Sequence, residues 1–285
     1  MRNESRAGTF LLLLPAATFI GLLFVYPFLY GLLLSFTQSE GHFTFTNYLR
    51  FFGDWWERRT IVVTLWISLP ATLVNVALAI PFAYAMRHGY RGEKVITFFL
   101  IMPLTLGTVL ISEGMLTFMG PKGWLNQLLL AVGIARQPVR FTHNYLGVLI
   151  SLIIQGFPFA FLMILGYVSG INPNLEKASQ MLGATRLQTF LRVLFPLMAP
   201  GIAICFCLNF VMAFSVFPSA VLLGEPSGPT RVIAYAAYQW AFEKFDWNMA
   251  SAISMVMAAI ELVVISVALV WRNTIYRGAS MVGKG

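Results

Sequence analysis

Six long apolar runs dominate the 285-residue sequence. A helix needs roughly 20 apolar residues, at 1.5 Å per residue, to cross the hydrocarbon core of a bilayer. Each run reaches that length, and none has the alternating pattern of a membrane barrel strand. We therefore expect an all-α, polytopic membrane helix bundle in a single domain, residues 1–285. The runs cover approximately residues 8–36, 60–86, 95–119, 144–169, 193–223 and 247–271.

The charge-poor composition agrees with a lipid environment. Hydrophobic residues make up 58% of the chain and charged residues 11%, whereas soluble domains average about 25% charged residues. The first run is far longer than the roughly 7–15 residues of a signal-peptide core, so we expect a retained membrane helix there.

The net charge of +8 is spread between the apolar runs instead of forming one patch, which argues against a nucleic-acid partner. With both termini inside, the inner segments carry 11 Lys and Arg in about 52 residues, against 8 in about 70 outside. Because basic residues concentrate in cytoplasmic loops, we expect cytoplasmic N and C termini.

Proline and glycine predict where the spans bend. In the fourth run, Gly156 followed by Pro158 predicts a break beside a cavity. The first and fifth runs are long enough to tilt or to contain a break at a proline. The prolines concerned are Pro15, Pro27, Pro200 and Pro218.

The segment 172–190, between the fourth and fifth runs, is unlike an ordinary connection. Asn172 is a suitable N-cap, with Pro173 at the first helical position. An apolar stripe at helical spacing follows it, formed by Leu175, Ala178 and Leu182. These features predict a short amphipathic helix.

Gly183 suits the end of this first helix. Thr185 and Gln188 have the spacing of a capping box, which starts a second helix that runs into the fifth run. The pattern predicts two short helices joined by a glycine bend at the cytoplasmic face. Such an element either docks its apolar residues in a groove of a partner or lies on the membrane surface as an amphipathic connector.

This segment resembles the EAA signature of type I ABC-importer permeases. In that family a Glu-Ala-Ala triplet precedes Gly-Ala, then Phe, then Ile-x-Leu-Pro. The corresponding residues here are Lys177-Ala178-Ser179, Gly183-Ala184, Phe190 and Val193-Leu194-Phe195-Pro196. Lys177 replaces the usual Glu, and Glu176 lies one residue earlier, about 100° away around a helix. The resemblance implies ATPase coupling through Glu176, Lys177, Ala178, Ser179, Leu182, Gly183, Ala184 and Arg186.

Two other stretches look like the same family. The start, from Leu11 to Thr37, looks like its usual first span. The stretch from Phe214 to Ala252 is similar to the branch serving spermidine/putrescine, aminoethylphosphonate, sulfate and iron. The resemblance implies a type I ABC-importer permease fold and a pathway for a small charged solute, polyamine-like or aminophosphonate-like.

The resemblance also implies partners and a location. The partners are an ABC ATPase dimer, a second permease subunit with a heterodimer favoured, and a periplasmic or lipid-anchored solute-binding protein. The location is the bacterial cytoplasmic (inner) membrane, in contact with membrane lipid.

Motifs for catalysis and cofactor binding are missing from the sequence. There is no G-x-x-x-x-G-K-[ST] phosphate loop, so we expect ATP and Mg to be bound by a separate ATPase, with no cofactor in this chain. No metal-ligand spacing and no catalytic Ser/His/Asp or Cys/His grouping is present. The alternatives are a secondary transporter driven by an ion gradient, which often has internal repeats, and an intramembrane enzyme.

Four polar residues inside the runs are candidates for the translocation pathway: Glu113, Gln155, Asn209 and Glu261. An acidic residue near a helix centre raises the insertion free energy by about 2.5–3.5 kcal/mol, so it usually faces the bundle interior or a water-filled path. The alternative is that each of them forms hydrogen bonds between helices, as also expected for Asn75.

Overall fold

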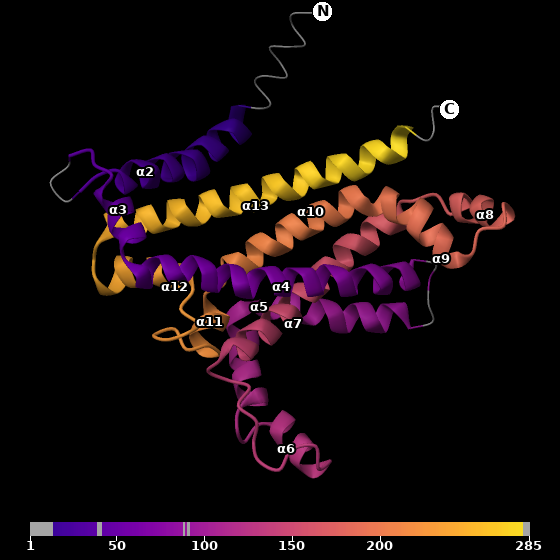
Figure 1. Ribbon diagram of the computed structural model, residues 1–285, viewed down its shortest axis with the longest axis horizontal. Coiled ribbons are helices and arrows are strands. Elements are labelled where there is room, and N and C mark those ends of the chain that lie inside the picture. The colour runs from indigo at the N-terminus through magenta and orange to yellow at the C-terminus, as the bar shows by residue number, and fades with distance from the viewer. Residues whose placement is uncertain (1–13, 39–41, 88, 90–91, 282–285) are drawn as a thin grey trace, which may run out of the picture. The chain divides into compact units, whose positions relative to one another are not determined.

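The computed structural model describes residues 14–38, 42–87, 89 and 92–281, and it is built from helices (Figure 1). In these ranges the only strand-like pairing is an isolated bridge between Thr37 and Phe43. The first helices are the π-helical turn η1 (Gly21–Val25), α2 (Tyr26–Ser35), α3 (Thr46–Gly53), α4 (Trp55–Met86), α5 (Glu93–Met119), α6 (Trp124–Ala131) and α7 (Tyr145–Ser169). The later helices are α8 (Asn174–Met181), α9 (Arg186–Thr189), η2 (Phe190–Leu194), α10 (Phe195–Phe214), α11 (Pro218–Leu222), α12 (Ile233–Tyr238), η3 (Gln239–Glu243) and α13 (Trp247–Met281).

Six helical stretches in the described part of the chain are long and apolar enough to cross a membrane. This confirms the predicted all-α class and the predicted number of spans. Residues 8–13 of the first predicted run lie outside the described residues. The six stretches are Leu14–Ser35, Trp55–Met86, Lys94–Ala131, Tyr145–Ser169, Arg186–Phe214 and Trp247–Arg272.

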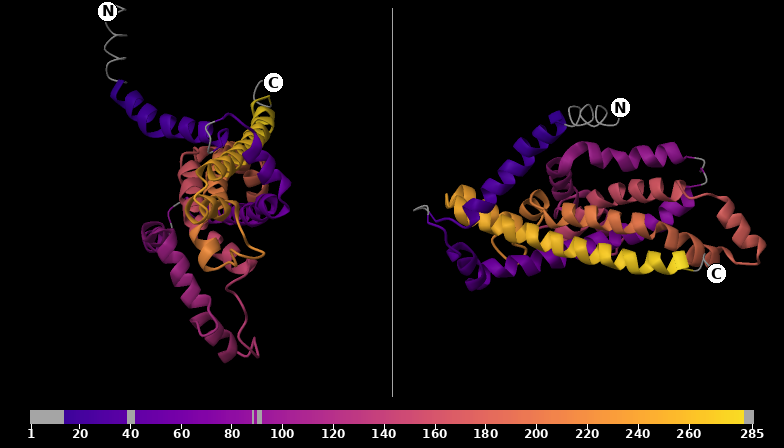
Figure 2. Two further views of the ribbon diagram at one scale, coloured as in Figure 1. Left: turned by 90° about the vertical axis from the view of Figure 1, so that its left-hand side faces the viewer. Right: turned by 90° about the horizontal axis from the view of Figure 1, so that it is seen from above.

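The described chain forms two compact units. Within the described ranges, the larger comprises residues 59–235 and 259–281, and the smaller comprises residues 14–58 and 236–258. In the larger unit α7 packs against both α5 and α10, and the three views show these helices side by side (Figures 1 and 2). The short helices α8 and α9 lie together beyond the end of this helical packing (Figure 1).

Two apolar clusters form the core of the larger unit. The first lies nearer the 172–190 loop and joins α4, α7 and α10 through residues such as Phe161 and Met198. The second lies toward the other ends of these helices, where α5 also contributes, and it includes Ile67 of α4 and Met119 of α5. Asn75 on α4 falls between the residues of the two clusters, so a polar layer separates two dry cores.

In the smaller unit, two asparagines hold the turn that follows α2. Asn47 donates from Nδ2 to the carbonyl oxygens of Ser35 at 3.1 Å and Thr37 at 2.9 Å. Asn248 donates from Nδ2 to the Thr37 carbonyl at 2.9 Å and to its hydroxyl at 2.8 Å. Carbonyl oxygens at the end of a membrane helix need hydrogen-bond donors, and these two side chains supply them to the carbonyls that end the first span.

The third span bends at Gly107, a position for which no bend was predicted. Gly107 has φ 75° and ψ 160°, so α5 consists of two helical pieces joined at a kink. This conformation lies in a region that residues with a Cβ rarely adopt, whereas glycine enters it at little cost. The kink therefore depends on a single glycine inside the span.

The break predicted in the fourth span is wrong. The helix α7 runs without interruption from Tyr145 to Ser169 through Gly156 and Pro158. Gly156 instead permits close packing, because a Cβ there would collide with the side-chain nitrogen of Asn75.

The fifth span also differs from its predicted limits of 193–223. It starts earlier, at Arg186, and α10 ends at Phe214. Phe217 has φ −126° and ψ −59°, outside the helical region, and Pro218 then starts the separate helix α11. Proline disfavours a helical conformation in the residue before it, which explains why the helix stops here.

Candidate functional site

The 172–190 loop has the two-helix form that its sequence predicts. The helix α8 begins at Asn174, one residue later than expected, and the Asn172 side chain accepts from the Asn174 amide at 2.9 Å. Gly183 has φ 87° between the two helices, so the bend uses the left-handed conformation that favours glycine. The predicted capping box is present, since the Gln188 amide donates to the Thr185 hydroxyl and the Thr185 amide donates to the Gln188 side chain.

A buried ion pair attaches the loop to the end of α4. Arg87 Nη1 lies 2.9 Å from Glu176 Oε1, and these side chains are only 2% and 9% exposed. Arg87 Nη2 also donates to the Ile171 carbonyl at 3.3 Å. Removing one partner of a buried pair typically destabilises a protein by about 3–5 kcal/mol. The loop is therefore attached to the second span as well as being continuous with the fourth and fifth.

The opposite face of the loop is apolar and exposed. Leu182 and Met181 are 89% and 87% exposed, so neither packs against the described part of this chain. Of the other residues predicted for ATPase coupling, Lys177, Ala178, Gly183 and Arg186 are also exposed. Ser179 and Ala184 are half-buried, and Ser179 Oγ lies 3.1 Å from the Thr189 hydroxyl on α9. Glu176 is the only one of the eight predicted coupling residues that is buried. It therefore anchors the loop, whereas the exposed residues are accessible to a partner.

A polar layer crosses the larger unit between its two apolar clusters. Asn75 Nδ2 donates to Asn209 Oδ1 at 3.1 Å, and Asn209 Nδ2 donates to the Gly156 carbonyl at 2.9 Å. These contacts join α4, α7 and α10. Asn75 and Asn209 are only 0% and 1% exposed, which agrees with the interhelical hydrogen bonding expected for such residues.

A second polar group surrounds Ser219 of α11. Gln155 Nε2 donates to the hydroxyls of Ser151 at 2.6 Å and Ser219 at 2.9 Å. The Ser219 hydroxyl also lies 2.9 Å from that of Ser112 on α5. Gln155 was predicted as a pathway residue, whereas the serines were not. The four-residue spacing of Ser151 and Gln155 on one helix face was the only local signal for this group.

One cavity brings two of the four predicted pathway residues together. It has a volume of about 120 Å³, and both Gln155 and Asn209 line it. Gly107, at the kink of α5, lines the same cavity. Polar groups that converge between membrane helices are typical of solute pathways, although this cavity is smaller than the roughly 300–1,000 Å³ of most ligand pockets.

The two acidic candidates lie elsewhere. Glu113 is exposed on the surface of α5, one residue from the buried Ser112. Glu261 on α13 is half-buried and accepts a hydrogen bond from the Ser215 hydroxyl at 2.9 Å. Within this chain Glu113 therefore does not face the interior, and its place in a translocation pathway stays a prediction. Among the described residues, no group of three His, Cys, Asp or Glu is placed to hold a metal ion.

Comparison with known proteins agrees with these features. Residues 75–277 match the family described as "Binding-protein-dependent transport system inner membrane component". The chain is 29% identical over 217 residues to the spermidine/putrescine transport system permease protein PotB of Escherichia coli (strain K12), covering 73% of this chain and 78% of that protein. It is 28% identical over 203 residues to the probable sulfate transport system permease protein cysT of Prototheca wickerhamii, covering 71% and 78%.

Solved structures show the same fold. A chain of a bacterial alginate ABC transporter, solved with an alginate pentasaccharide-bound periplasmic protein, gives a TM-score of 0.81 at 23% identity and covers 96% of this chain and 97% of that one. An inward-facing MetNI methionine ABC transporter gives a TM-score of 0.57 at 15% identity, covering 79% and 96%. An ion-gradient transporter finds no support among these relatives. Since the family match covers most of its length, this chain belongs to the binding-protein-dependent transport system inner membrane components, the multi-pass permease subunits of ABC importers.

Proposed function

We propose that the 172–190 loop couples an ATPase to this permease, and that a small charged solute crosses the membrane beside the polar layer. The observation that carries the coupling proposal is the two-sided loop. One side exposes Met181 and Leu182 to a partner, and the other anchors Glu176 to Arg87. A force on the exposed side therefore acts on three spans at once: the second, the fourth and the fifth.

The proposed partners follow from this arrangement. The exposed apolar face of α8 suits a hydrophobic groove on an ABC ATPase dimer, which would bind the ATP and Mg. A solute-binding protein would deliver the solute on the opposite side, and both termini would be cytoplasmic, as the basic loops favour. No nucleic acid and no cofactor of this chain's own enters the proposal.

A second permease subunit completes the proposed pathway. Glu113 is exposed on a spanning helix, and a carboxylate that faces lipid raises the insertion free energy by about 2.5–3.5 kcal/mol. A second chain, or a water-filled path between two chains, removes this penalty. We favour a heterodimer, because the branch this chain resembles often pairs two different permeases.

The proposed solute belongs to a narrower class than the solutes named for the similar proteins. The similar proteins carry names that refer to spermidine/putrescine and to sulfate, all of them small charged solutes. We propose a polyamine-like cation or an aminophosphonate, since an acid at Glu113 and the amides of Gln155 and Asn209 suit an amine-bearing solute.

A substitution in the exposed face tests the coupling proposal. Leu182→Asp places a charge on a side chain that is 89% exposed, so it should leave the fold unchanged and prevent docking in an apolar groove. The measurements are co-purification of the ATPase and solute-stimulated ATP hydrolysis. Ile134→Asp, at a 74% exposed isoleucine that follows α6 and lies outside the six spans, is the matched control and should behave like the unmodified permease. Normal ATPase binding and normal stimulation in Leu182→Asp would show that the loop is only a surface connector.

A further inference from the structure

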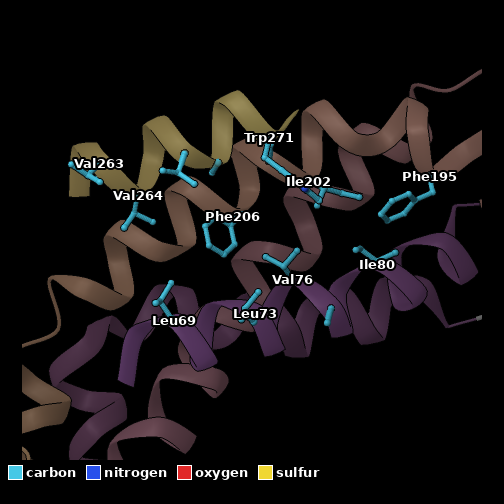
Figure 3. Close-up of a pocket in the computed structure, with 14 residues that line it drawn as sticks. Leu69, Leu73, Val76, Ile80, Phe195, Ile202, Phe206, Val263, Val264 and Trp271 are labelled. Carbon is cyan, nitrogen blue, oxygen red and sulfur yellow. The ribbon is translucent and has the colours of Figure 1, made fainter. Parts of the chain in front are cut away.

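A large apolar groove runs along three spans of the larger unit, away from the polar layer. Its volume is about 630 Å³, and α4, α10 and the later part of α13 line it (Figure 3). Every lining residue is apolar. They are Leu69, Leu73, Val76, Ala77, Ile80, Phe195, Ile202, Ala203, Phe206, Val263, Val264, Val267, Ala268 and Trp271.

The groove is built into the helices as a continuous stripe. On α4 the lining residues recur at steps of three, four and one between Leu69 and Ile80, the spacing of one helix face. Figure 3 shows Leu73 and Val76 of α4 extending toward Phe206 of α10 and Val264 of α13. Apart from the indole N–H of Trp271 the lining side chains are hydrocarbon, so water gains almost no hydrogen bonds there, and an apolar space of this kind does not hold water. Hydrocarbon is the occupant that such a lining favours.

The length of the groove selects among hydrocarbon occupants. Leu69 to Ile80 spans eleven helical steps, which is about 16 Å. One leaflet supplies about half of a hydrocarbon core that is roughly 30 Å thick. Most of the lining residues lie in the halves of α4, α10 and α13 nearer the 172–190 loop, while Leu69, Phe206 and Val263 lie just past the midpoints of these helices. A groove that covers one leaflet fits an acyl chain, whereas a docked transmembrane helix would need a groove across both leaflets.

The volume of the groove suits an acyl chain. A cavity of about 150 Å³ is enough for benzene, so 630 Å³ holds roughly 25 carbon atoms by proportion. This is room for one acyl chain and part of a second.

The charge at the loop-side end completes the argument. The last lining residue of α13, Trp271, is followed by Arg272, the first charged residue of this helix after Glu261. Arg192 is exposed, three residues before the lining residue Phe195. Tryptophan and arginine at a span end are typical of the headgroup level, and basic residues beside a groove between membrane helices favour an anionic headgroup.

We propose that this groove binds an anionic phospholipid of the leaflet on the side of the 172–190 loop, with an acyl chain between α4, α10 and α13 and its phosphate near Arg272. The bound lipid fills the space that the three helices leave open and holds α13 against α4 and α10. It is a structural ligand of the permease and not its transported solute.

Native mass spectrometry of the full-length permease, purified in detergent with its partner subunits, tests the acyl-chain site. The double variant Ala77→Phe/Ala268→Phe fills the groove from two positions that are not fully buried, so its folding should be retained. We expect it to retain one phospholipid fewer per permease chain than the unmodified protein. Ala259→Phe, at an exposed alanine of α13 outside the groove, is the control and should retain the full number. An unchanged lipid count in the double variant would overturn the proposal.

Two further measurements test the lipid site without the groove-filling substitutions. Delipidated protein should gain several degrees in Tm from dioleoyl-phosphatidylglycerol and markedly less from dioleoyl-phosphatidylcholine, and Arg272→Gln should abolish this difference. Equal gains from the two lipids would overturn the headgroup assignment. A photo-crosslinking residue at Val267, which is 65% exposed, should capture phospholipid. Capture of a second permease chain there would mean that a protein helix fills the groove.

Discussion

Replacing Arg87 by methionine removes one member of the ion pair that attaches the 172–190 loop to α4. The two side chains are 2% and 9% exposed, so solvent neither screens the pair nor rehydrates Glu176 when its partner is lost. The Ile171 carbonyl also loses the donor that now lies at 3.3 Å. Breaking a buried pair of this kind destabilises a protein by about 3–5 kcal/mol.

This penalty is expected to appear as local opening of the loop before global unfolding. A loss of about 3–5 kcal/mol corresponds to a roughly 150-fold to 5,000-fold change in an opening equilibrium. The hydrogen-exchange rates of the α8 and α9 amides should rise by up to this factor, while the rates in the middle of α7 should change little. Solute-stimulated ATP hydrolysis should fall with it, because the partner then acts on a loop that no longer holds α4.

Two control variants make the reasoning refutable. Arg87→Met/Glu176→Met replaces the pair by apolar groups and should recover most of the lost protection, since such replacements are often neutral or stabilising. Arg50→Met breaks an exposed pair with Asp246, whose N–O distance is 3.6 Å and whose side chains are 49% and 29% exposed. Exposed pairs contribute only about 0–1 kcal/mol. An Arg87→Met effect no larger than that of Arg50→Met would refute the buried anchor.

Three further predictions concern the membrane-embedded residues. Gly156→Ala should destabilise the bundle by about 1–3 kcal/mol, because its Cβ collides with Asn75, whereas Gly166→Ala on the same helix meets no atom within 4 Å and should be neutral or slightly stabilising in a denaturant titration. Thr72→Val should raise Tm, because the Thr72 hydroxyl is fully buried without a hydrogen-bond partner. Thr64→Val should lower Tm, because the Thr64 hydroxyl donates to the Thr60 carbonyl at 2.6 Å and accepts from the Ile233 amide at 2.9 Å. The opposite order of Tm values would contradict these hydrogen bonds. Glu113→Gln should weaken solute uptake without lowering the amount of folded complex, and unchanged uptake kinetics would remove Glu113 from the pathway.

Local chemistry explains the features that could be predicted from the sequence. The six apolar runs require membrane helices, because lipid leaves the backbone no other partner for its polar groups. The bend at Gly183 and the capping box of Thr185 and Gln188 depend on residues within a few positions of one another. The resemblance of this segment to a known signature could be found for the same reason.

Other features depend on contacts between distant residues. Arg87 and Glu176 are 89 positions apart, and Asn75 and Asn209 are 134 apart, so no local pattern connects them. Gly156 and Pro158 together predict a break, but Gly156 serves close packing, while Gly107, four residues after Pro103, is where the third span bends. A glycine only permits a bend, and the surrounding helices decide whether the bend or the close contact has the lower free energy.

The number of spans and the form of the loop were therefore determined by the sequence itself. Only the tertiary structure decided that Glu176 points inward to an arginine, that Gln155 and Asn209 share a cavity, and that Glu113 faces outward. The physical reason is that periodicity specifies which residues share one face of a helix, whereas the direction of that face is set by all the helices that pack around it.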